Sequence, residues 1–178
     1  MKTREITIPT GQKFTVPQGI QRLDSDSTRG WQVRYQGTKY FSDGAAPDKA
    51  LEGATRELLR RIATLPAPVN LRRAPSPSKT SKLPAGISGP LLVSKAGSEA
   101  QSAVLSVLVP RFGKANQTKR VHIGTPNTYT KARFRAALAT AVEIRSESLA
   151  VYEAAATKAK RKAARTMKQT LWAVRSGA

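Results

Sequence analysis

Side chains able to act as acids, bases or nucleophiles are sparse in this sequence. His122 is the only histidine and cysteine is absent, so a catalytic base or a metal ion would lack the companions that such sites use. Asp24 and Asp26 lie close together, which is a weak signal for a nuclease, and polar residues of a turn explain them better. The sequence contains no glycine-rich phosphate loop. We therefore predict that the protein is not an enzyme and holds neither a metal nor a cofactor.

Basic side chains are the chemistry that the sequence does supply. Its 178 residues include 31 Lys and Arg against 11 Asp and Glu, a formal net charge of +20. The excess positive charges repel one another and do not stabilise the fold. A chain usually carries such an excess because it binds a polyanionic partner such as nucleic acid, an anionic membrane or an acidic protein tail. No apolar run is long enough to cross a bilayer, and the N-terminus lacks the apolar stretch of a signal peptide. We expect a cytoplasmic, nucleoid-associated protein without a membrane partner.

A proline-rich stretch, residues 66–85, divides the sequence. Its five prolines exclude a helix or a central strand and predict an extended, basic, mobile linker. Residues 71–98 carry five basic and no acidic side chains, and residues 99–178 carry 15 and four. Most of the affinity for a polyanion should therefore lie in the linker and the C-terminal half. Arg72 and Arg73 are expected to cross a minor groove or the phosphate backbone.

The first module has the pattern of short strands followed by a helix. Alternating apolar residues predict a hairpin over residues 5–16, and Trp31, Val33 and Tyr35 share one face of a later strand. A helix is expected over residues 47–65, with proline in its first turn. This helix covers one face of a three-stranded sheet and leaves the other bare. The candidate DNA contacts of the module are Gln21, Arg22, Gln32, Arg34, Gln36, Thr38 and Tyr40.

The second module repeats this order of three strands and a helix. Strands are expected near residues 87–93, 102–109 and 120–125, and a helix begins near Thr130. Alternation places His122 on the open sheet face, where it is either a solvated strand histidine or a nucleic-acid contact. The candidate DNA contacts of this module and its basic turn are Arg111, Lys114, Lys119, Arg120 and His122.

These patterns predict an α+β protein with two small modules, each a three-stranded antiparallel sheet packed on one helix, and a long basic C-terminal helix. The expected divisions are 1–65 for the first module with its N-terminal hairpin, 66–85 for the linker, 86–145 for the second module and 146–178 for the basic helix. From Thr130 to Ala173 there is no Gly or Pro. One long helix and two helices joined at residues 145–148 both fit this stretch.

Residues 158–168 are nearly all basic or alanine. They fit a solvated helix end, a helix that lies along phosphates, or a helix on a membrane surface. The face opposite the charges is mainly Ala156, Ala159, Ala163 and Met167, which is too small to insert well into a membrane. Phosphate contact is therefore favoured over membrane contact. The candidate residues are Lys158, Arg161, Lys162 and Arg165.

Several short motifs extend the interpretation of both modules. Residues 30–35 (Gly-Trp-Gln-Val-Arg-Tyr), residues 39–42 (Lys-Tyr-Phe-Ser) and a helix containing residues 50–54 occur in the first module. Residues 86–89 (Gly-Ile-Ser-Gly) and 121–125 (Val-His-Ile-Gly-Thr) occur in the second. Together they resemble the plant ethylene-responsive-factor (apetala-two) DNA-binding domain and its bacterial and phage relatives, in two tandem copies. The plan is also similar to the arm-binding domains of tyrosine recombinases.

The resemblance implies that the sheets enter the major groove and that Arg and Trp side chains touch bases and phosphates. By position it adds Ser106 and Leu108 to the contacts of the second module. Arg recognises guanine and Gln recognises adenine through paired hydrogen bonds in that groove.

The leading prediction is a double-stranded DNA-binding protein, either a bacterial or phage transcriptional regulator or a nucleoid-type protein. One alternative is an RNA-binding or ribosome-associated protein. Another is a recombination accessory protein that forms a homodimer through its C-terminal helix. For the polar residues of the bare sheet face, the alternative to nucleic-acid contact is that they are simply the solvated side of a half-exposed antiparallel sheet.

Overall fold

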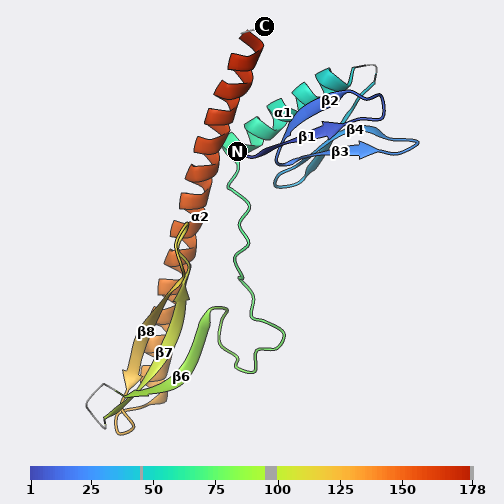
Figure 1. Ribbon diagram of the computed structural model, residues 1–178. Coiled ribbons are helices and arrows are strands. Elements are labelled where there is room, and N and C mark those ends of the chain that lie inside the picture. Colours follow the sequence, from blue (N-terminus) through green and yellow to red (C-terminus); the bar gives the residue numbers. More distant parts are fainter. Residues whose placement is uncertain (45, 95–99, 177–178) are drawn as a thin grey trace. The chain divides into compact units, whose positions relative to one another are not determined.

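The computed structural model describes residues 1–44, 46–94 and 100–176, with side chains as far as Gln169. Within those residues the fold is α+β, with three antiparallel sheets and two helices (Figure 1). The strands are β1 (Thr3–Thr7), β2 (Lys13–Pro17), β3 (Ile20–Asp24), β4 (Arg29–Arg34), β5 (Thr38–Ser42), β6 (Ile87–Ser94), β7 (Gln101–Val109) and β8 (Gln117–Gly124). The helices are α1 (Pro47–Thr64) and α2 (Lys131–Ser176). The predicted α+β class and the predicted long C-terminal helix are confirmed.

The chain divides into two compact units. The first unit combines Met1–Pro68 with Ala156–Ala178, and the second unit is Val69–Ala155. Each contains a three-stranded sheet, β3-β4-β5 in the first and β6-β7-β8 in the second. The expected two-module layout is confirmed only in part, because β1 and β2 form a third, separate sheet.

The β1–β2 hairpin is separate because it packs on the core of the first unit instead of extending its sheet. The Phe14 ring meets the Trp31 ring edge-on, with centroids 5.5 Å apart, and Val16 is fully buried. Gly19 turns the chain between β2 and β3 with φ +107°. A Cβ at Gly19 would lie 3.1 Å from a methyl of Leu58, so glycine also permits this close packing. The hairpin thus adds an apolar layer of its own to the core.

The core of the first unit lies between β3-β4-β5, α1 and the hairpin. Pro47 begins α1, where its missing N–H is not needed, and Asp48 in the first turn interacts favourably with the helix dipole. Leu58, four residues after the buried Ala54, is fully buried against the sheet, as is Trp31. The Trp31 indole Nε1 donates a hydrogen bond to the carbonyl oxygen of Pro47 at 3.0 Å. The predicted apolar face of β4 is therefore the face that α1 covers.

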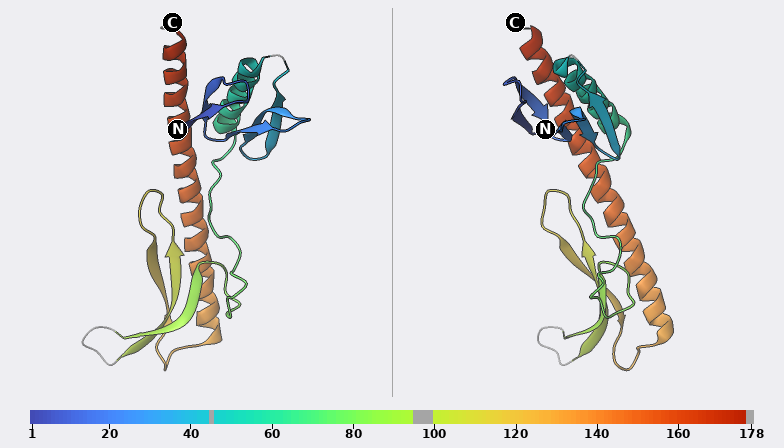
Figure 2. Two further views of the ribbon diagram at one scale, coloured as in Figure 1. Left: turned by 45° about the vertical axis from the view of Figure 1, so that its right-hand side comes forward. Right: turned by 90° about the vertical axis from the view of Figure 1, so that its right-hand side faces the viewer.

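The core of the second unit lies between β6-β7-β8 and the first part of α2 (Figure 2). Leu105 and Val107 of β7 are fully buried, and Ala137 and Ala141 are the buried alanines that α2 contributes to this core. These alanines recur at four-residue spacing, so they lie on one face of α2 and allow it to approach the sheet closely.

Helix α2 is continuous through residues 145–148, where the sequence allowed either one helix or two. The hydroxyls of Ser146 and Ser148 donate to the carbonyl oxygens of Glu143 and Arg145, which keeps these polar side chains within the helix. Arg145 is buried, and its guanidinium donates to the carbonyl oxygens of Leu108 and Arg72. Burial lowers the pKa of the Arg145 guanidinium. The apparent polar break is thus a point where the helix is held to β7.

The proline-rich stretch forms neither helix nor strand, as its prolines predict. Part of it nevertheless packs on the second unit. Leu83 belongs to the apolar core there, and the Lys79 ammonium donates to the carbonyl oxygens of Pro84 and Ile87, each at 2.7 Å. Lys79 is therefore tied to the backbone at the start of β6.

Candidate nucleic-acid interface

The face of β3-β4-β5 turned away from α1 is an open, mainly polar surface. Gln32 of β4 lies between Gln21 of β3 and Tyr40 of β5 in the strand register. Arg34 pairs with Thr38 at the end of the same sheet. Because side chains alternate between the two faces of a strand, all five lie on the face opposite Trp31 and Val33. The structure therefore brings these five predicted residues together on one surface.

Two contacts within this surface hold its side chains in place. The Arg34 Nε donates to the Gln32 Oε1 at 2.5 Å, and the terminal guanidinium nitrogens form no hydrogen bond or ion pair with the described residues. The Tyr40 hydroxyl donates to the carbonyl oxygen of Arg29 at 2.7 Å. A Cβ at Gly30 would lie 2.8 Å from the Tyr40 ring and 2.2 Å from the Phe41 carbonyl oxygen, so only glycine lets the ring lie across the strand.

Arg22 does not belong to this open face, contrary to its place among the predicted contacts. It pairs with Trp31 in the register, and its guanidinium lies 4.9 Å from the centroid of the indole ring. Both terminal nitrogens bond the Asp43 carboxylate, at 2.8 and 2.6 Å, and only 10% of the Arg22 side chain is exposed. The hydrogen bond with Asp43 raises the pKa of Arg22. Its two-residue separation from buried Ile20 is the sequence signal that places it on the covered side.

Gln36 lies in the turn after β4 and not on a strand. It has φ +49°, an uncommon value outside glycine, and its side-chain amide lies 3.4 Å from the carbonyl oxygen of Pro66. The Gly37 that follows has φ +106° and completes the turn. Gln36 is exposed, but it faces the loop after α1 instead of joining the row of Gln21 and Gln32.

The second unit has a comparable open face of mixed character. In the register Ser106 of β7 pairs with Arg120 of β8, and Val104 pairs with His122. Arg120 and His122 are both exposed and lie on one face, as predicted. Leu108, a predicted contact by resemblance, lies on this face with 41% of its surface exposed. The face is therefore basic along β8 and apolar along β7.

The turn between β7 and β8 and the first part of β8 carry further basic side chains. Arg111, Lys114 and Lys119 are exposed, and the Arg111 Nε donates to the carbonyl oxygen of Ala115 at 3.0 Å. Lys119 pairs with Val107, so it lies on the opposite face of the sheet from Arg120. The Phe112 ring meets Tyr152 of α2 edge-on at 5.6 Å, which fixes the base of this turn.

The C-terminal part of α2 has one buried and one basic face. Ala164 and Met167 are buried, and Ala164 belongs to the core of the first unit. The apolar face that seemed too small for a membrane thus packs against this unit. Among the described residues, no helix is long and apolar enough to span a membrane. The predicted residues Lys158, Arg161, Lys162 and Arg165 are all exposed.

Of the two linker arginines predicted to contact DNA, one already has a partner within the protein. Arg73 forms an ion pair with Glu153 of α2. Arg72 is exposed, and its carbonyl oxygen accepts a hydrogen bond from Arg145.

The described part of the chain holds no group of three or more His, Cys, Asp or Glu residues placed to bind a metal ion.

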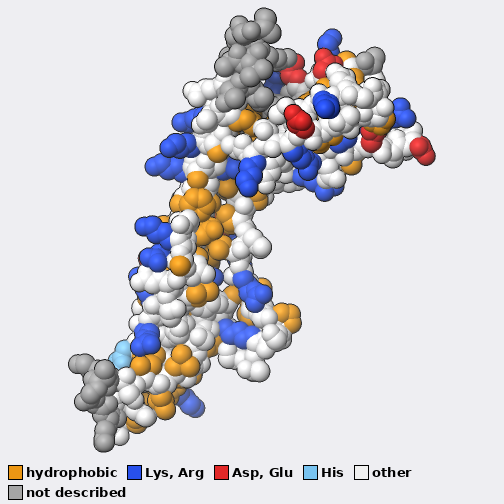
Figure 3. All heavy atoms as spheres, in the orientation of Figure 1, with side chains coloured by type: hydrophobic (Ala, Val, Ile, Leu, Met, Phe, Trp, Pro, Cys, Tyr) orange, Lys and Arg blue, Asp and Glu red, His pale blue; other side chains and the backbone are white. Residues whose placement is uncertain are grey.

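Helix α1 contributes exposed basic residues that the sequence analysis did not select. Arg56 and Arg60 extend from its polar face, and Figure 3 shows Lys and Arg side chains on both units of the molecule. Their four-residue spacing on a helix with a defined apolar face was the signal that could have identified them.

Comparisons with protein-family models, curated proteins and solved structures found no match to this chain.

Proposed function

We propose that this protein binds double-stranded DNA and places the open face of β3-β4-β5 in the major groove. The observation that carries the proposal is the cross-strand row of Gln21, Gln32 and Tyr40 beside Arg34, on a sheet face that no helix covers. A face of two or three strands matches the width of the major groove. Arg and Gln are the side chains that form paired hydrogen bonds with guanine and adenine there.

Charge supports the same partner on both units. The first unit carries 18 basic and seven acidic residues, and the second carries 13 and four. Several of the acidic residues are already paired, as Asp43 is with Arg22 and Glu57 is with Arg60 and Arg61. Each unit therefore has more basic side chains than its own acidic side chains can pair with. Phosphate contacts supply affinity without sequence preference, while the sheet face supplies the preference.

This activity suits a transcriptional regulator or a nucleoid-type protein of the cytoplasm. The two roles differ in sequence preference, because a regulator needs base contacts whereas a nucleoid protein can bind through phosphates and DNA shape. The polar row on the first sheet favours the regulator.

A competition experiment tests the proposal. The full-length chain is bound to a labelled random-sequence DNA duplex at about 0.15 M salt, and unlabelled duplex DNA, single-stranded DNA and duplex RNA of equal length are added in turn. Duplex DNA should compete at least about tenfold better than the other two, because B-form DNA alone offers a major groove wide enough for the sheet. Equal or better competition by duplex RNA would refute the proposal and favour an RNA-binding protein.

A further inference from the structure

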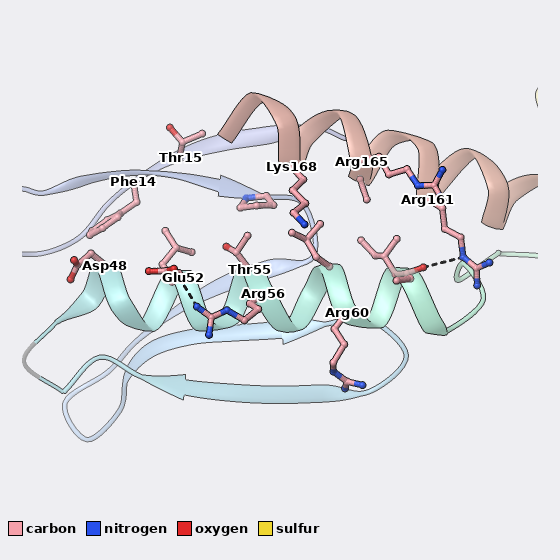
Figure 4. Close-up of a pocket in the computed structure, with 16 residues that line it drawn as sticks. Phe14, Thr15, Asp48, Glu52, Thr55, Arg56, Arg60, Arg161, Arg165 and Lys168 are labelled. Atoms are coloured by element: carbon pink, nitrogen blue, oxygen red, sulfur yellow. Dashed lines mark hydrogen bonds and ion pairs between the residues drawn. The ribbon is translucent and has the colours of Figure 1, made fainter. Parts of the chain in front are cut away.

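The first unit contains a long groove whose lining includes no residue of the open face of β3-β4-β5 (Figure 4). Its volume is about 1110 Å³, and one side of it is the outer face of α1. The other side is formed by β2 and by the C-terminal part of α2. The residues that line it are Phe14, Thr15, Pro17, Asp48, Leu51, Glu52, Thr55, Arg56, Leu59, Arg60, Ile62, Ala63, Arg161, Ala164, Arg165 and Lys168.

The groove follows α1 along almost its whole length. Its lining residues on α1 run from Asp48 to Ala63 at three- and four-residue intervals, so one continuous face of the helix is involved. At 1.5 Å per residue this face is about 22 Å long. That length corresponds to about four turns of a helix lying alongside, whereas a small anion would occupy only a fraction of it.

The lining combines apolar side chains with an uneven charge. Phe14, Leu51 and Leu59 are only partly buried, although each packs on the core of the unit. Five basic side chains and two acidic ones line the groove. The two acidic residues, Asp48 and Glu52, lie at the N-terminal end of α1, while the basic residues lie along its C-terminal half and on α2.

Some of these basic side chains already have partners in the unit. The Arg161 Nε donates to the carbonyl oxygen of Ile62 at 3.3 Å, where a cation interacts favourably with the end of α1. Arg60 pairs with Glu57 at 2.8 Å. Arg165 is exposed, and within the described ranges it takes part in no ion pair. It is therefore the side chain of the groove best placed to meet a negative charge from outside.

We infer that this groove binds an amphipathic, acidic helical segment of a partner protein. A helix that lies in a groove buries one apolar face, with side chains at positions i, i+3, i+4 and i+7, and leaves its polar residues at the rim. The apolar lining suits the first feature, and the basic excess suits carboxylates at the second. A DNA duplex has no apolar surface to cover Leu51 and Leu59.

The probe for a direct test is a fluorescein-labelled synthetic peptide of 14 residues. It carries leucine at positions 1, 4, 5, 8, 11 and 12 and alternates Glu with Gln elsewhere, so that one helical face is apolar. Its control is a scrambled peptide of the same composition and charge. Binding to the full-length chain is measured by fluorescence anisotropy at about 0.15 M salt. The scrambled peptide should bind at least tenfold more weakly.

Two matched charge reversals on α2 locate the binding site. Arg165→Glu changes a residue that lines the groove, and Lys162→Glu changes an exposed neighbour that does not. Arg165→Glu should weaken binding of the amphipathic peptide at least tenfold, and Lys162→Glu should change it less than twofold. Circular dichroism is expected to show unaltered helix content in both variants, because both side chains are exposed.

Three results would overturn the inference. Equal binding of the two peptides would show that charge alone attracts them, and equal losses in the two variants would show that the groove is not the site. Displacement of the peptide by duplex DNA, with the same loss in Arg165→Glu, would assign the groove to phosphate binding. The inference does not rest on the proposed contact of the β3-β4-β5 face with DNA, because peptide binding and the DNA competition are measured separately.

Discussion

Arg34 is the residue on which direct recognition of bases depends in the first unit. It is exposed, and its Nε is bonded to Gln32, so the terminal nitrogens of the guanidinium can form a paired hydrogen bond with guanine. Arg34→Ala should relax sequence preference at one position of a selected DNA site, at a cost of about 1–3 kcal/mol. Sequencing of DNA selected from a random pool by the wild-type and variant proteins measures this.

Lys39→Ala is the matched control for Arg34→Ala. Lys39 carries the same charge on the neighbouring strand, but it pairs with Val33 and lies on the opposite face, 5.4 Å from the Phe41 ring centroid. Its removal should weaken binding to all sequences alike and leave the selected motif unchanged. An unchanged motif in Arg34→Ala as well would rule out base recognition by Arg34.

Glu57 predicts a pH dependence of stability. Hydrogen bonds from Arg60 and Arg61 lower the pKa of its carboxyl from 4.5 to about 2. A carboxylate with a lowered pKa stabilises the folded state fully above the pKa it has when unfolded, and this contribution disappears as the pH falls through the folded value. The stabilisation by Glu57 should therefore be present above about pH 5 and be lost progressively toward pH 2.

Denaturant unfolding of Glu57→Gln against the wild type measures this effect. The difference in unfolding free energy should be about 1 kcal/mol at pH 7, since charge-assisted hydrogen bonds are lost. It should shrink steadily below pH 4.5, because the wild-type carboxyl is then protonated on unfolding. A difference that stays constant down to pH 2 would contradict the assignment.

At the scale of elements, the C-terminal part of α2 predicts the salt dependence of binding. Its exposed Lys158 and Lys162 are expected to lie near phosphates, and each phosphate contact adds about one unit to the slope of log affinity against log salt. Lys158→Gln combined with Lys162→Gln should therefore flatten the slope by about two units and weaken binding to all sequences alike. Titrations of duplex DNA at several salt concentrations give the slope.

A second double variant provides the control for this element. Lys13→Gln with Lys49→Gln removes the same charge from exposed positions in β2 and α1 of the first unit. Its slope should change by well under one unit. If the two double variants flatten the slope equally, binding depends on total charge, and the C-terminal part of α2 makes no specific contribution to it.

At the scale of the whole molecule, the C-terminal part of α2 packs on the core that the N-terminal residues of the first unit form. The N-terminal ammonium of Met1 lies 3.4 Å from the carbonyl oxygen of Ala163, and Met167 is 5% exposed. Met167→Ala should lower the unfolding free energy of the first unit by about 2 kcal/mol, at the low end for core truncations because the site lies at the edge of the core. Gln169→Ala, at an exposed position of the same helix, should change it by less than about 0.5 kcal/mol.

Thermal unfolding followed by tryptophan fluorescence and by circular dichroism checks this prediction, because Trp31 belongs to the core that Ala164, three residues before Met167, also joins. Equal stability of Met167→Ala and Gln169→Ala would mean that α2 does not contribute to the first unit in solution.

Much of the candidate site followed from alternation along single strands. Alternation placed Gln32 and Arg34 on the open face because Trp31 and Val33 had to be buried together. It also places Arg22 on the buried side, since Ile20 is two residues away, although Arg22 stood among the candidate DNA contacts. Gln36 was misplaced for a different reason: alternation was continued past the end of β4, although Gly37 marks the turn in which Gln36 lies.

The sequence by itself determined the properties that depend on composition and on short-range pattern. These are the net charge of +20, the lack of cysteine, the proline-rich division of the chain and the face of β4 that packs on α1. The tertiary structure alone decided that the hairpin forms its own sheet, that α2 passes residues 145–148 without a break, and that its C-terminal part joins the first unit. Each of these depends on contacts between residues far apart in the chain, such as Ala67 with Thr157 and Arg145 with Leu108. Local propensity carries no information about such contacts, because their free energy comes from the fit of surfaces that exist only once both partners have folded.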